Sequence, residues 1–188
     1  MTRELPVKGP ELDRLSELVS IGAGHAASAF AMLTGRTIWM GVPKVFERTT
    51  SAAPAPSEEF ATGVFFEFEG CLEAVVGILF HARASEALVR RVVGVEDGAL
   101  SPHMIESALM EVGNILASHV ASAIADTLRQ RLLPSIPTLA MASAAVEFER
   151  FIGLREGPHP VRVESSLVDE SGELGGLLVM VPRIRGAR

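Results

Sequence analysis

The chain has 188 residues, 48% of them apolar, which is enough to bury the core of one domain or of two small ones. Its net charge is −6 and no run of Lys or Arg occurs, so a nucleic-acid-binding surface is not expected. A single cysteine, Cys71, excludes an internal disulfide and suggests a reducing compartment. The residues after Met1 do not resemble an apolar leader, and no stretch of about 20 consecutive apolar residues occurs. We therefore expect a cytoplasmic protein without a membrane span.

The first half of the chain predicts a long helix followed by shorter elements. The helix should begin at Pro10, since proline suits the first helical position, and end near Thr34, since Gly35 favours a helix C-terminus. The elements expected after it are a strand, a hairpin and a short helix, at residues 37–46, 63–80 and 84–93. The hairpin should turn at residues 69–71, and Gly94 should end the short helix.

The second half predicts a similar order. Ser101 is a good N-cap residue and Pro102 suits the first helical position, so a second long helix should run from Pro102 to about Leu128. The elements expected after it are a strand within 134–146, a short helical turn near Phe148, and a hairpin of residues 161–168 and 174–181 that turns at 170–172.

The similarity extends to the residues themselves. Residues 13–31 and 107–125 are identical at nine of nineteen positions without a gap, at an offset of 94 (107 − 13 = 94). Two copies are too few for a solenoid, so we predict one domain, residues 1–188, built from two repeats at about 10–94 and 101–182 around a pseudo-twofold axis. Each repeat supplies a long helix, a strand and a hairpin. The expected class is therefore α+β, with one mainly antiparallel sheet and the long helices packed on it.

A row of polar residues lies on the second long helix. Ser107, Glu111 and Asn114 follow each other at spacings of four and three, which places them on one side of a helix. The row lies away from the apolar stripe of the same helix, which consists of Leu109, Leu116, Val120 and Ile124. A carboxylate and a carboxamide thus share one exposed strip that has no packing role.

The first long helix carries the same row as Asp13, Glu17 and Ser20. An exposed Glu and Asn on a single helix are usually ordinary surface residues. Ordinary surface exposure, however, does not explain why Glu occurs at the equivalent position of both repeats, so the duplication indicates a functional role for the row. The repeat also pairs His25 with His119, and because neither belongs to a Cys or carboxylate cluster, structural histidines are favoured over a metal site.

With the proline that follows each row, the pattern resembles the CheC/CheX/FliY phosphatases of bacterial chemotaxis. Their motif is Asp or Ser, three residues, Glu, two residues, Asn, twenty-two residues and Pro. The second repeat matches it throughout, at Ser107, Glu111, Asn114 and Pro137. The first repeat matches at Asp13, Glu17 and Pro43 but has Ser20 in place of Asn. Two motif copies and a short helix between the halves are most similar to the CheC type, because the CheX type has one such site per chain.

The resemblance implies a protein phosphatase that removes phosphate from the aspartate of a CheY-like response regulator. Asn114 would orient the attacking water and Glu111 would pair with the regulator's lysine, while Ser107 would belong to the docking surface. No cofactor is expected on this chain, since the regulator brings its own Mg²⁺.

The equivalent residues of the first repeat would be Glu17 and Ser20 as catalytic positions and Asp13 as a docking residue. Ser20 puts this site in doubt, because a hydroxyl is shorter than a carboxamide. The expected partner is a phosphorylated CheY-like regulator, and the chain is expected to be a monomer.

Two other functions stay open at this point. One is a non-catalytic docking module like the middle domain of flagellar switch proteins, which resembles this family. The other is an adaptor for the receptor deamidase CheD, which is compatible with phosphatase activity. The intact Asn114 favours the enzyme, and the missing Asn at Ser20 leaves the alternatives in place.

Overall fold

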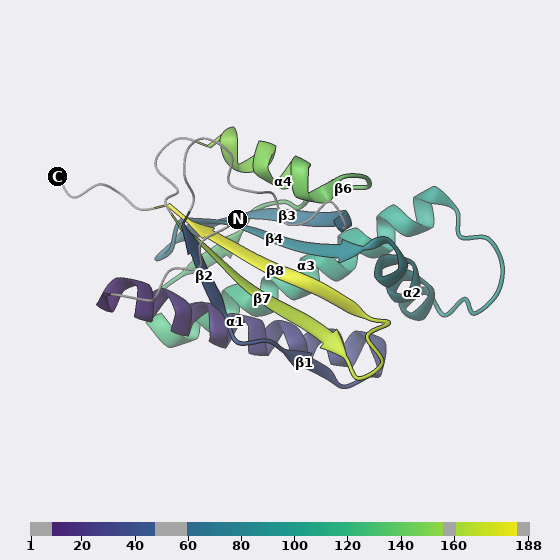
Figure 1. The fold of residues 1–188 in the computed structure, drawn as a ribbon, viewed down its shortest axis with the longest axis horizontal. Helices are drawn as coiled ribbons and strands as arrows, with labels where there is room; N and C mark the ends of the chain where they lie inside the picture. Colours follow the sequence, from purple (N-terminus) through teal and green to yellow (C-terminus); the bar gives the residue numbers. More distant parts are fainter. Residues whose placement is uncertain (1–8, 48–59, 156–160, 184–188) are drawn as a thin grey trace.

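The computed structural model describes residues 9–47, 60–155 and 161–183. They form an eight-stranded sheet in the order β1-β7-β8-β4-β3-β5, with β2 also paired to β7 and β6 to β3, and every pairing is antiparallel. Long helices cover one face of the sheet and a shorter helix, α4, covers the other (Figure 1). The predicted α+β class and mainly antiparallel sheet are confirmed.

The strands follow the same order in both halves, but among the described residues α2 is present in the first half alone and α4 in the second half alone. The first half consists of α1 (Pro10–Thr34), β1 (Ile38–Met40), β2 (Lys44–Glu47), β3 (Phe60–Gly70), β4 (Ala74–His81) and α2 (Ala82–Val93). The second half consists of α3 (Pro102–Leu128), β5 (Leu132–Pro134), β6 (Thr138–Ala140), α4 (Ala144–Gly153), β7 (Val161–Asp169) and β8 (Gly175–Pro182).

Local signals at the helix ends set the lengths of the two long helices. Pro10 opens α1, and at the start of α3 the Ser101 hydroxyl accepts a hydrogen bond from the Met104 backbone N–H at 3.2 Å. Gly35 ends α1 in the left-handed conformation. Arg129, 94 residues later (129 − 35 = 94), ends α3 in the same conformation with φ 52°. Both predicted helices are confirmed, with the boundaries expected.

The two halves are interlocked at the sheet. The centre of the sheet is the pairing of β4 with β8, where Gly77 lies opposite Val179. On one side, β1 and β2 of the first half pair with β7 of the second half. On the other side, β5 and β6 of the second half pair with β3 of the first half. Each half therefore completes the sheet of the other, as a pseudo-twofold relation requires.

The sheet is buried on both faces. The larger core lies between the sheet and helices α1, α2 and α3, and its largest fully buried members are Phe30, Phe66, Phe68, Phe80, Leu109 and Leu116. The smaller core lies under α4, where the Phe65 ring contacts those of Phe148 and Phe151 with centroids 5.1 and 5.6 Å apart. Burial of these side chains is the main stabilising term, at about 1.5–3 kcal/mol each.

Helices α1 and α3 pack against each other and run in opposite directions (Figure 1). Their closest approach involves Gly22, since a Cβ placed there would lie 2.9 Å from the Val120 side chain. Although α3 is long and apolar enough to resemble a membrane span, more than half of that stretch is buried inside the fold, as in a core helix. The absence of a membrane span stays a prediction.

Three sequence predictions need correction. The single strand expected over 37–46 is two strands separated by residues 41–43, where the Gly41 N–H donates to the Ser166 carbonyl and Pro43 has no N–H to continue the ladder. The strand expected within 134–146 is confirmed as β6, and a further short strand, β5, begins before this range. The first hairpin turns at residues 71–73, not 69–71, because β3 continues through Gly70.

The third correction concerns α4, a ten-residue helix where a single helical turn was expected near Phe148. Its first residue follows Ser143, which has a left-handed conformation at φ 49° and makes no side-chain capping hydrogen bond. The usual signal for a helix start is therefore missing from the sequence at this point.

We expect Gly113→Ala to destabilise the fold by about 1–3 kcal/mol, because overpacking forces neighbouring groups apart. A Cβ at Gly113 would lie 2.5 Å from the Val64 side chain, so α3 would have to move away from the sheet. Gly153→Ala is the matched control, since a Cβ there meets nothing within 4 Å at the end of α4. Urea unfolding of both variants measures the difference, and equal stability would show that α3 does not pack this closely.

Candidate functional site

The predicted row on α3 is exposed, as the sequence suggested. Ser107, Glu111 and Asn114 lie on the solvent side of the helix, while Leu109 and Leu116 of the same helix are fully buried. Within the part of the chain that the structure describes, no side-chain hydrogen bond or ion pair involves Glu111 or Asn114. Their polar groups are thus available to another molecule.

The equivalent row on α1 differs at one position. Asp13 and Glu17 are exposed and Ser20 is half-buried. The row continues along the helix through Gly24, where a Cβ would lie 3.6 Å from the sulfur of Met40 in β1. The polar row therefore ends where the short strands of the same half begin to cover the helix.

The proline of each motif lies in the loop between the two short strands of its half. In the second half this is loop 135–137, between β5 and β6. The Ser135 N–H donates to the Glu67 carbonyl at 2.8 Å, and the Glu67 N–H donates to the Ser135 hydroxyl at 2.9 Å. Pro137 thus belongs to a loop that β3 holds in place from the other half of the chain.

The first half holds its own loop, residues 41–43, in the same way. The Gly41 N–H donates to the Ser166 carbonyl at 2.8 Å, and the Ser165 hydroxyl donates to the Gly41 carbonyl at 2.8 Å. A side chain at position 41 would collide with the Ser166 hydroxyl, which explains glycine here where the second half has Ser135. Both loops are fixed by backbone bonds to a strand of the opposite half.

The structure keeps the two rows apart. Gly22 meets Val120 where the antiparallel helices approach, so Glu17 is level with residue 125 on α3, fourteen residues from Glu111 (125 − 111 = 14). At 1.5 Å per residue this separates the two glutamates by about 20 Å along the helix pair. Each row is a separate site, and the two do not combine into one.

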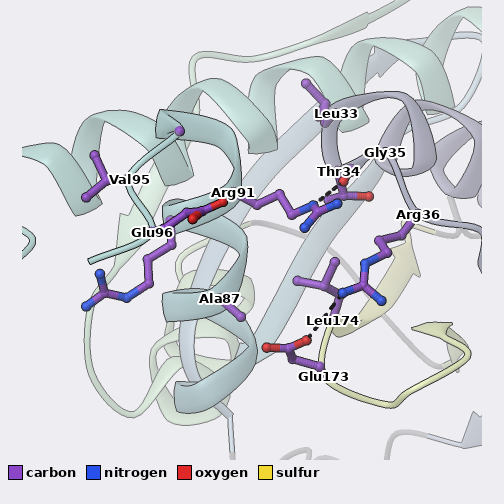
Figure 2. Close-up of a pocket in the computed structure, with 12 residues that line it drawn as sticks. Leu33, Thr34, Gly35, Arg36, Ala87, Arg91, Val95, Glu96, Glu173 and Leu174 are labelled. Atoms are coloured by element: carbon purple, nitrogen blue, oxygen red, sulfur yellow. Dashed lines mark hydrogen bonds and ion pairs between the residues drawn. The ribbon is translucent and has the colours of Figure 1, made fainter. Parts of the chain in front are cut away.

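A hollow lined by charged side chains lies away from both rows. A cavity of about 610 Å³ is formed by the ends of α1 and α2 and the turn between β7 and β8, and it contains no residue of either row. Figure 2 shows two of its arginines, Arg91 and Arg36, directed at groups of the protein itself. The Arg91 guanidinium donates to the Thr34 carbonyl, and Arg36 forms ion pairs with Glu173 at 3.8 Å and Asp169 at 3.9 Å.

The ionisable groups with shifted pKa values also lie away from the rows. Burial acts to raise the pKa of Asp169, but hydrogen bonds from Ser171 and the Leu174 backbone, together with the charge of Arg36, outweigh it and hold this pKa below its usual value. Glu164 has a raised pKa, because burial disfavours its charge more than Arg162 favours it. Both belong to β7, which contains no residue of either row.

The two repeated histidines lie on the surface. His25 and His119 are exposed, and His119 Nδ1 lies 2.9 Å from the Ile115 carbonyl on its own helix. No group of three or more His, Cys, Asp or Glu side chains gathers as a metal site among the residues that the structure describes. The row on α3 presents a carboxylate and a carboxamide, and the row on α1 presents two carboxylates and a hydroxyl.

Sequence reasoning missed the groups that hold the loops. Glu67 and Ser135 are 68 residues apart, and Ser165 and Gly41 are 124 apart. Such contacts depend on which half each strand joins, and no local spacing signals them.

Comparison with known proteins agrees with this description. A model of the CheC-like family matches residues 104–141, which include Glu111, Asn114 and Pro137. The chain is 32% identical over 188 aligned positions to the CheY-P phosphatase CheC of Bacillus subtilis, with 94% of this chain and 90% of the relative covered.

Solved structures share the fold. Thermotoga maritima FliY matches with a TM-score of 0.69 at 19% identity, over 94% of this chain and 91% of the other. A chain from the CheX–CheY–BeF₃–Mg²⁺ complex of Borrelia burgdorferi matches with a TM-score of 0.61 at 13% identity, over 90% of this chain and 99% of the other. With a curated relative aligned along nearly its whole length, the chain belongs to the CheC-like family.

Proposed function

We propose that the protein is a phosphatase that hydrolyses the phosphoaspartate of a CheY-like response regulator. The observation that carries this proposal is the exposed row of Glu111 and Asn114, unengaged by the described part of the chain and followed by Pro137 in a rigidly held loop. Support comes from the relative in Bacillus subtilis, which is named for activity on CheY-P, and from a neighbour of the same fold in complex with CheY.

The chemistry of phosphoryl transfer explains why an exposed row of side chains can be sufficient for catalysis without a deep pocket. Such reactions depend on positioning and charge stabilisation, with little covalent chemistry left to the enzyme. The substrate here is itself a protein with its own aspartate, lysine and Mg²⁺, so no deep cavity is required. What remains to be supplied is an oriented water, and the Asn114 carboxamide can hold one in line with the phosphorus, as a glutamine does in GTPases.

The other residues of the row act through docking. The Glu111 carboxylate lies one helical turn from Asn114, so a bond to the regulator's lysine would fix the distance between Asn114 and the phosphoryl group. Ser107, one turn further, extends the contact surface. In the first row, Glu17 and Asp13 offer the same contacts, while the Ser20 hydroxyl is too short to hold the water at the same reach.

The setting of this activity is also part of the proposal. The protein acts as a cytoplasmic monomer outside the membrane, with the phosphorylated regulator as its partner and no nucleic acid.

A docking role without hydrolysis, as in flagellar switch proteins, and binding of CheD are the alternatives. Phosphate release from acetyl-phosphate-treated CheY, with and without this protein, separates the enzyme from a pure docking module.

Asn114→Ala should lower the rate of phosphate release by about 10- to 1,000-fold, since it removes one positioned polar group from the transition state. Affinity for the regulator should change less, because orientation of water matters mainly in the chemical step. Glu111→Ala should weaken docking and turnover together. Full activity of purified Asn114→Ala would refute the mechanism.

Ser20→Asn tests whether the first row differs from the second only because the Ser20 side chain is too short to hold the water. It should at most about double the rate per chain at saturating phospho-regulator, since two equal sites work independently. The gain should persist in Ser20→Asn/Asn114→Ala, where the repaired row acts alone. A double variant no more active than Asn114→Ala would show that the first row has lost its docking surface as well.

Hydrolysis should require Mg²⁺ bound to the regulator. EDTA should stop phosphate release, and calorimetry of the isolated protein should give no stoichiometric, tight Mg²⁺ binding, since the described residues include no cluster of three or more metal-ligating side chains. Tight binding of Mg²⁺ or Zn²⁺ to the isolated chain would contradict this.

A further inference from the structure

Two of the most exposed large apolar residues of the described chain occupy equivalent positions in the two halves. Ile136 is 88% exposed and Val42 is 83% exposed. They are 94 residues apart (136 − 42 = 94), and each directly precedes the proline of its motif. Both are β-branched aliphatic residues in loops that join the two short strands.

Packing does not account for this repetition, because neither side chain is buried in the fold. Exposed apolar residues that occur singly need no explanation. A pair that returns at the offset of the repeat is different, since the hydrophobic gain of a large aliphatic group is realised only when something covers it. The duplication therefore indicates contact with a partner at both positions.

The location of Val42 and Ile136 relative to the two polar rows indicates which partner covers them. On α1 the polar row continues to Gly24, which meets Met40 of β1, and Val42 follows Met40 by two residues. Two residues of extended chain span about 7 Å, and the four helical residues from Gly24 back to Ser20 span about 6 Å. These lengths place Val42 about level with Ser20 along α1.

The second half has the same relation between loop and row. Gly113 lies against Val64 of β3, and the chain partner of Val64 in β6 is Leu139. Ile136 lies in the loop between β5 and β6, and both of these strands contact α3. Because Ile136 follows Asn114 by the same number of residues as Val42 follows Ser20, the repeat places it at the equivalent position beside the second row.

The loops also hold these residues in place before binding. Ser135, next to Ile136, is bonded on both its N–H and its hydroxyl to the Glu67 backbone, and its hydroxyl also donates to the Ile136 carbonyl at 3.0 Å. Gly41, next to Val42, is bonded on both its N–H and its carbonyl to residues of β7. An apolar group held rigidly costs little conformational entropy on binding.

We infer that Ile136 is an apolar docking residue that the response regulator covers while its phosphoaspartate lies against Asn114, and that Val42 has the same role at the first row. This inference rests on the proposed function and adds to it a residue that sets affinity and specificity. The matching surface on the regulator is an apolar patch beside its phosphorylation site.

The test compares Ile136→Asp and Ile136→Ser with wild type, using CheY as the probe. Each variant should raise KM for phospho-CheY about ten-fold or more and leave kcat within about two-fold, because the residue contacts substrate and transition state equally. Affinity for CheY loaded with BeF₃ and Mg²⁺ should fall by a similar factor. Ile136→Leu should restore most of it, since a leucine can fill an apolar patch.

Leu154→Asp is the matched control, because Leu154 is 75% exposed and follows α4, on the opposite face of the sheet. Its KM should equal that of wild type. The inference would be overturned if Ile136→Asp left KM and affinity unchanged, or if Leu154→Asp lost as much affinity. In either case, phosphate release by the wild-type protein would leave the proposed function intact. A wild-type chain that neither binds nor dephosphorylates CheY would overturn both.

Discussion

The antiparallel pairing of β4 with β8 is the constraint on which the rest of the structure depends. It places Gly77 opposite Val179 at the centre of the sheet and so joins two halves that share an offset of 94 in their helices. On either side of this centre, β1 and β2 pair with β7, and β5 and β6 pair with β3. The antiparallel helices α1 and α3 then cover one face, and their polar rows are directed to solvent.

The proposed site is an exposed helical face, since Ser107, Glu111 and Asn114 are all exposed on α3. The hollow beside Arg36 and Arg91 contains no residue of either row, and these two arginines are bonded to the protein itself. Under the proposed mechanism, the substrate is a folded protein that brings its own metal. The chain then has to supply only a carboxamide that orients the water, a carboxylate that fixes the docked position, and a rigid surface around them.

Much of this could be predicted from the sequence, because the signals were local. Pro10, Gly35, Ser101 and the spacing of Glu111 and Asn114 determine helix ends and one helical face, which depend on residues a few positions apart. The rest depends on distant pairings. The break in the strand at Gly41 is set by Ser166 in the other half. Helix α4 begins after Ser143 without a capping hydrogen bond, so the sequence contains no signal for the start of this helix.

The exchange of short strands between the halves also bears on how a duplicated enzyme can change. Loop 41–43 beside the first row is held by β7, and loop 135–137 beside the second row is held by β3. A change in the row of one half therefore does not release its long strand, because that strand holds the loop beside the row of the other half. Glu17 is outside this structural requirement, since its side chain is exposed and belongs to no strand.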